Sequence, residues 1–91
     1  MNSAFVQERS ERYAARLMDE AAGDDDRLNL VFESAFARPP DAPERQRALA
    51  YLAQSRQKLE VAHVSPDLVA QESWASFLRA VLASNEFIYI D

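Results

Sequence analysis

One glycine and four prolines divide this 91-residue chain into segments, and their positions constrain the fold more than any other feature. Gly23 follows a first segment with helical spacing of apolar residues, where a left-handed helix end favours glycine. Pro39 and Pro40 end a second segment, because proline lacks the amide hydrogen of a helix interior and restricts the residue before it. Pro43 and Pro66 fall where further helices begin, and a proline in the first turn loses no hydrogen bond. So little glycine disfavours β-rich folds and glycine-loop architectures.

Apolar residues recur within these segments at the i, i+3, i+4 spacing of one helix face. The spacing predicts a first helix over residues 3–22 and a second over 25–37. A third helix starts after Asp41 and continues to residue 60. Asp41 and Glu44 have the spacing of a capping box, in which each side chain accepts a hydrogen bond from the other residue's backbone.

The fourth helix has a clear apolar stripe over residues 74–82, but the sequence does not fix the residue at which this helix begins. Residues 66–73 are either helical from their proline onward or form a loop before a helix that starts near Gln71. After a helix end near Ser84, the apolar tail 87–90 packs against the helices or pairs with chain outside this sequence. We therefore predict an all-α fold, a compact bundle of about four helices with a short extended C-terminal tail, forming a single domain over residues 1–91.

Composition disfavours several classes of function. The sequence holds 10 Lys and Arg against 15 Asp and Glu, and this net charge of −5 disfavours a nucleic-acid groove, which needs cations to neutralise phosphates. Without cysteine there is no disulfide, thiolate metal site or cysteine nucleophile. No apolar run is long enough to span a membrane, and the first residues lack the pattern of a signal peptide. We expect neither nucleic-acid binding nor membrane insertion.

Few residues have a spacing that indicates chemistry. Asp24, Asp25 and Asp26 suggest a calcium or magnesium site, but calcium loops alternate their ligands and contain a turn glycine and a distal glutamate. We expect these aspartates to cap a helix and to carry solvated charge. His63 is the single histidine and has no second histidine or cysteine with which to bind zinc, so we expect packing or solvation. The prediction is no catalytic, cofactor-binding or metal-ligating residue, no cofactor and no enzymatic activity by itself.

Two further features are open to a structural or an interaction role. Arg38-Pro39-Pro40 is either a proline ligand for a groove of aromatic residues on a partner protein or a rigid corner between helices. We expect the corner, in which Arg38 interacts with the exposed carbonyls at the end of the preceding helix. Aromatic residues are numerous for a chain of this size. We expect them to form the core, and aromatic surface left over at the tail to mark an interface; they include Phe32, Phe36, Trp74, Phe77, Phe87 and Tyr89.

Three ordered stretches resemble one protein family. They are residues 1–8 (MNSAFVQE), 35–52 (AFARPPDAPERQRALAYL) and 74–91 (WASFLRAVLASNEFIYID). Together they resemble the C-terminal region of planctomycete proteins that carry the domain of unknown function numbered 1553. In that family a segment close to LMNSPFV, an Arg-Pro-Pro corner with a downstream glutamate, and LLNSNEFLYVD follow in this order. Ala4 stands where the family has proline, and Ala83 where it has asparagine.

The resemblance implies that Met1 matches a methionine inside a longer chain, so that residues 1–91 are the excised C-terminal piece of a larger protein. Parents in this family are typically exported and often combine with cytochrome c-like modules, but their activity is not established. No catalytic residue is carried over from it. The Arg-Pro-Pro and Asn-Glu-Phe motifs are then structural signatures, a helix corner and a helix end that leads into the tail.

We expect a non-catalytic structural or protein-interaction module of a larger extracytoplasmic protein, with upstream domains of the parent chain or another protein as partners. The alternative is an accessory part of an enzyme or redox protein, forming one wall of a site completed by upstream domains. Arg38, Glu44, Trp74 and Glu86 are the candidates for that wall. A third hypothesis, a free-standing acidic protein that binds a basic partner, requires Met1 to be the true initiator, which the reading frame upstream of it would show.

Overall fold

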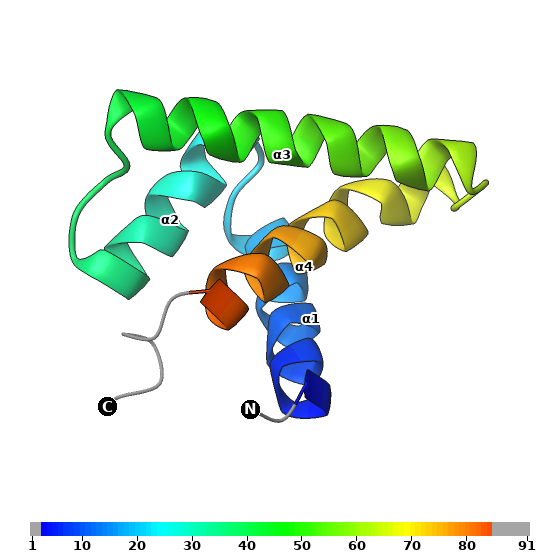
Figure 1. Ribbon diagram of the computed structural model, residues 1–91, viewed down its shortest axis with the longest axis horizontal. Coiled ribbons are helices and arrows are strands. Elements are labelled where there is room, and N and C mark those ends of the chain that lie inside the picture. Colours follow the sequence, from blue (N-terminus) through cyan, green and yellow to red (C-terminus); the bar gives the residue numbers. More distant parts are fainter. Residues whose placement is uncertain (1–2, 85–91) are drawn as a thin grey trace.

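The computed structural model describes residues 3–84 and confirms the all-α fold (Figure 1). The helices are α1 (Ser3–Glu20), α2 (Asp24–Phe36), α3 (Ala42–Val61) and α4 (Pro66–Ser84), and residues 3–84 contain no strand. The prediction of an extended tail at residues 87–90 lies outside the described residues.

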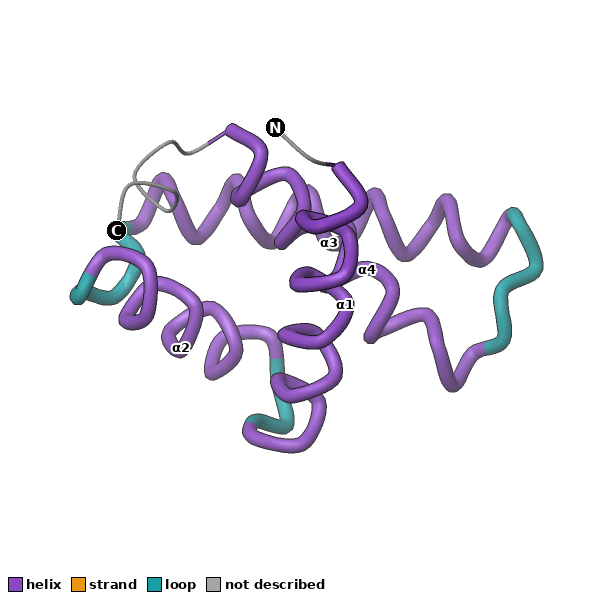
Figure 2. Tube along the Cα trace, turned by 90° about the horizontal axis from the view of Figure 1, so that it is seen from below, coloured by secondary structure: helices purple, strands orange, loops and turns teal. Residues whose placement is uncertain are grey.

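Helix α4 forms the centre of the bundle. It packs against α1 on one side and against α3 on the other, while α2 packs against α3 (Figures 1 and 2). In Figure 1 the C-terminal part of α4 and the whole of α2 lie below the N-terminal half of α3. Side chains of α2, α3 and α4 pack together in one buried cluster, which includes Phe32, Ala48 and Phe77.

The helix boundaries follow the proline positions closely. Helix α4 begins at Pro66, so residues 66–73 are helical from their proline onward and do not form a loop before the helix. The capping box predicted at the start of α3 is confirmed. The Glu44 amide donates to Asp41 Oδ1 over 2.8 Å, and the Asp41 amide donates to Glu44 Oε1 over 2.9 Å.

The conformation predicted for Gly23 is wrong. Gly23 is the N-cap of α2 with φ −132°, which is extended backbone that any residue adopts. Left-handed backbone occurs instead at Ala37, with φ 59°, and at His63, with φ 63°. The amide of Ala37 donates to Glu33 O over 3.0 Å, so Ala37 turns the chain out of α2. Gly23 has an extended backbone because it is the residue that immediately precedes α2, and N-cap residues adopt that conformation.

The core confirms the expectation for several aromatic residues. Trp74 is fully buried, and its ring meets that of Phe77 edge to face at a centroid distance of 5.5 Å. Each of the other three helices contributes a fully buried leucine to the same core: Leu17 from α1, Leu28 from α2 and Leu52 from α3.

Asp24 connects three helices, which corrects the expectation that it serves as a cap or as solvated charge, whereas Asp25 and Asp26 are exposed in the first turn of α2 as expected. The N-cap of α2 makes no side-chain hydrogen bond, and Asp24 lies inside the helix. Its carboxylate accepts two hydrogen bonds from Arg56 Nη2 on α3, at 2.7 and 2.8 Å. It also accepts one from the indole Nε1 of Trp74 on α4, at 3.0 Å. Asp25 forms an ion pair with Arg45, again to α3, over 2.8 Å.

Replacing Asp24 with alanine should lower the free energy of unfolding by about 1–3 kcal/mol, because the buried indole N–H of Trp74 then has no acceptor. The matched control is Asp26→Ala, an exposed aspartate in the same turn. That change removes only a favourable charge near the helix N-terminus, and should cost less than about 1 kcal/mol. Urea denaturation measures both, and equal losses would contradict the role of Asp24.

Replacing Ala37 with glycine should stabilise the protein by about 1 kcal/mol, because a side chain at positive φ is strained and glycine is not. The matched change Ala50→Gly, at an exposed position inside α3, should destabilise it by about 1 kcal/mol. Opposite shifts of the melting temperature are expected, and shifts of the same sign would contradict the strain at Ala37.

Candidate functional site

The residues considered for catalysis or metal binding do not come together. Within residues 3–84 no three His, Asp or Glu side chains are placed to hold a metal ion. His63 is exposed in the connection between α3 and α4. Of the residues considered for the wall of a shared active site, Trp74 is fully buried and cannot line a surface, and Glu86 lies outside the described residues.

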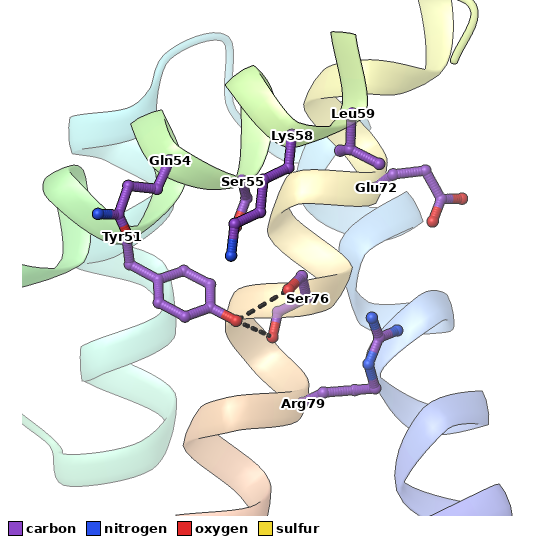
Figure 3. Close-up of a pocket in the computed structure, with 8 residues that line it drawn as sticks. All are labelled: Tyr51, Gln54, Ser55, Lys58, Leu59, Glu72, Ser76 and Arg79. Atoms are coloured by element: carbon purple, nitrogen blue, oxygen red, sulfur yellow. Dashed lines mark hydrogen bonds between the residues drawn. The ribbon is translucent and has the colours of Figure 1, made fainter. Parts of the chain in front are cut away.

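A polar pocket of about 260 Å³ lies between α3 and α4 (Figure 3). The Tyr51 hydroxyl points across it to Ser76, with 2.8 Å between the two hydroxyl oxygens, and donates to the Ser76 carbonyl over 3.3 Å. Lys58 on α3 points towards the Tyr51–Ser76 contact, whereas Arg79 on α4 extends away from it (Figure 3). The hydrogen bonds between Tyr51 and Ser76 join α3 to α4 across this pocket.

A second pocket, of about 410 Å³, is lined mainly by aromatic and aliphatic side chains of three helices. We call it the aromatic groove. Its apolar walls come from α2, α3 and α4, in the order Val31, Phe32, Phe36, Ala48, Tyr51, Phe77, Ala80 and Val81, and Glu44 and Arg47 add charge. Tyr51 lines both pockets, since its ring meets Phe77 edge to face at 5.8 Å while its hydroxyl reaches Ser76.

The Arg38 corner borders the aromatic groove. Its guanidinium makes paired hydrogen bonds to the two Glu44 carboxylate oxygens at 2.8 and 2.9 Å. The same guanidinium lies over the rings of Phe32 and Phe36, at 5.9 and 5.6 Å from their centroids. Arg38 donates to Pro39 O over 3.0 Å, so the prediction that it binds the carbonyls ending the preceding helix is wrong.

The corner shifts the titration of both charged groups. The hydrogen bonds from Arg38, followed by that from the Asp41 amide, lower the pKa of Glu44 from 4.5 to about 2. The Glu44 carboxylate in turn raises the pKa of Arg38. Both side chains are therefore charged across the physiological range, and the pair joins the chain before Pro39 to the first turn of α3.

The aromatic groove was not predicted from the sequence. Phe32 and Phe36 are four residues apart on one face of α2, and their rings lie 5.3 Å apart. That spacing indicates a shared face, but the same spacing is typical of a fully covered core face. The exposure of this face depends on where α3 and α4 pack, which the spacing within α2 does not indicate.

Comparison with protein-family models, curated proteins and solved structures gives no match in any of the three. The resemblance to the C-terminal region of planctomycete proteins therefore stays a prediction. Among the described helices, none is long and apolar enough to cross a membrane.

The Glu44 pKa predicts how stability depends on pH. Because the folded pKa is below the ordinary value, the stabilisation is complete above pH 4.5 and is lost as the pH falls towards about 2. The wild-type protein should melt at a higher temperature than Glu44→Gln at neutral pH, and this difference should disappear on acidification through that range. A melting-temperature difference that stays constant through this pH range would contradict the lowered Glu44 pKa.

Replacing Arg38 with glutamine should return the Glu44 pKa towards 4.5, because it removes the hydrogen bonds that lower it most. An NMR titration of the Glu44 carboxylate measures this shift.

Proposed function

We propose that this chain is a non-catalytic protein-interaction module, and that its aromatic groove binds an extended apolar segment with acidic residues at its ends. One observation carries the proposal. Aromatic side chains from three helices converge on a pocket bordered by arginine, at the place where α2, α3 and α4 meet. Such a surface offers apolar area and positive charge together, which suits a segment of that composition.

The size and lining of the groove favour burial of side chains. Its volume of about 410 Å³ is within the range of roughly 300–1,000 Å³ typical of ligand sites. Phe36 and Tyr51 are only partly buried, so an occupant removes further aromatic surface from water. Each well-placed aromatic pair adds about 0.5–1.5 kcal/mol beyond its buried area.

Charge at the edge of the groove favours acidic flanks on the occupant. Arg47 is exposed beside the pocket, and none of the ion pairs between described residues involves it. Arg38 places a second guanidinium over the Phe32 and Phe36 rings. The charge of Arg38 is balanced by the Glu44 carboxylate, so Arg47 supplies the net positive charge at this edge and favours an acidic group on the occupant.

We place the partner in the upstream domains of a larger, extracytoplasmic protein, as the family resemblance implies. A helical module that leaves an apolar groove open lowers its free energy by covering it, and a neighbouring domain of the same chain is present at high effective concentration.

Calorimetric titration with the separately produced upstream region tests the proposal. Binding by the wild-type chain is expected, and Phe36→Ser should weaken it at least about tenfold, or ~1.4 kcal/mol. Arg47→Glu should weaken it as well, most strongly at low salt.

The control is Leu68→Ser, which replaces an exposed apolar side chain at the N-terminal end of α4, outside the groove. Circular dichroism should show each variant folded. Absence of binding by the wild-type chain, or equal loss with Leu68→Ser, would contradict the proposal.

A further inference from the structure

The polar pocket between α3 and α4 contains the only lysine of the sequence, and the proposed function gives this pocket no role. Lys58 lies in the last turn of α3, and its side chain points towards the contact between Tyr51 and Ser76 (Figure 3). We infer that the polar pocket binds a small molecule that carries one carboxylate group and a short apolar part. The inference is independent of the aromatic groove, with which the pocket shares only the Tyr51 side chain among the described residues.

The charged side chains of the pocket favour a ligand with one negative charge. Within residues 3–84, neither Lys58 nor Arg79 forms an ion pair with another residue. Glu72 also lines the pocket, and Figure 3 shows its carboxylate extending away from the Tyr51–Ser76 contact. Two cations and one carboxylate give this lining a formal charge of +1. A single carboxylate on the ligand balances that charge, and Lys58 is the cation placed to meet it.

Hydroxyl groups beside Lys58 offer the further hydrogen bonds that a bound carboxylate needs. The Tyr51 hydroxyl donates to the Ser76 carbonyl over 3.3 Å, which is longer than the roughly 2.7–2.8 Å of a well-formed bond between a hydroxyl and an oxygen. Because a hydroxyl hydrogen rotates to its best acceptor, a carboxylate in the pocket takes this proton in a shorter, charge-assisted bond. The hydroxyl of Ser55 also lines the pocket, and it bonds to no other residue of the described range.

The size of the pocket and its apolar walls decide what else the ligand carries. A volume of about 260 Å³ is below the roughly 300–1,000 Å³ of sites for drug-sized ligands, so the ligand is small. Leu59 and the ring of Tyr51 add apolar surface beside the polar groups. A short hydrocarbon chain on the carboxylate covers this surface, whereas inorganic phosphate leaves it in water. The pocket therefore favours an organic monocarboxylate over phosphate.

Titration of sodium butyrate into the full wild-type chain, followed by NMR, tests the inference. Because Lys58 is the only lysine, protein grown with isotope-labelled lysine gives a single signal from the methylene group next to the ammonium. This signal and the amide signals of Ser55 and Ser76 should shift together and saturate at millimolar butyrate, relative to sodium chloride at the same ionic strength. Sodium phosphate should bind more weakly. Shifts no larger than those with sodium chloride, or phosphate binding as tight as that of butyrate, would overturn the inference.

Two variants and a control locate the bound carboxylate. Lys58→Met keeps an unbranched side chain without the charge, and should weaken butyrate binding at least about tenfold, because a hydrogen bond between charged groups is lost. Tyr51→Phe removes the hydroxyl but keeps the ring, and should weaken butyrate binding by a smaller factor. The control is Arg12→Met, which removes an exposed positive charge from α1, outside the pocket. Circular dichroism should show all three variants folded. If Arg12→Met weakens butyrate binding as much as Lys58→Met does, the effect is one of overall charge and the inference fails.

Discussion

The placement of α2 depends on the carboxylate of Asp24. It holds the start of α2 to Arg56 on α3 and to Trp74 on α4, while Asp25 adds an ion pair to Arg45. At the other end of α2, the chain is held to the first turn of α3 by Arg38 and Glu44. Helix α2 is thus attached by charged groups at both ends, and between them it presents Phe32 and Phe36 to the aromatic groove. The position of this groove wall follows from the two attachments.

These charged contacts position the helix more than they stabilise it. Asp24 and Arg56 are partly exposed, with 22% and 32% of their side chains accessible, and ion pairs in such positions add little net free energy once desolvation is counted. Their value is geometric, because a carboxylate shared by an arginine and an indole N–H is satisfied in one arrangement of the three helices. Apolar burial of Leu28 and Val31 supplies most of the free energy that holds α2 in place.

Prolines and apolar spacing predicted the number and type of helices and the capping box at Asp41, since these depend on local backbone chemistry. The conformation of Gly23 was not predictable in the same way, because it depends on how the short connection between α1 and α2 is oriented by the packing of the two helices. The partners of Asp24 lie 32 and 50 residues away, beyond any local pattern. Arg56 was the available signal, since a charged residue within the apolar stripe of a helix needs a partner. The aromatic groove depends on the packing of three helices, and only the pairing of Phe32 with Phe36 pointed towards it.

The walls of the groove differ in how firmly they are held. Tyr51 and Phe77 join α3 to α4 through an edge-to-face contact, and the Tyr51 hydroxyl is bonded to Ser76 on the far side, so these two walls are linked by uncharged contacts. The wall formed by α2 is attached by ion pairs, which salt and acid weaken while leaving uncharged contacts almost unchanged. The charged contacts at the two ends of α2 therefore weaken with salt and acid, whereas the contacts between α3 and α4 do not. The exposed arginine at the edge of the groove, Arg47, lies on α3, so an acidic group on an occupant pairs with the α3 side and adds no ion pair to the attachment of α2.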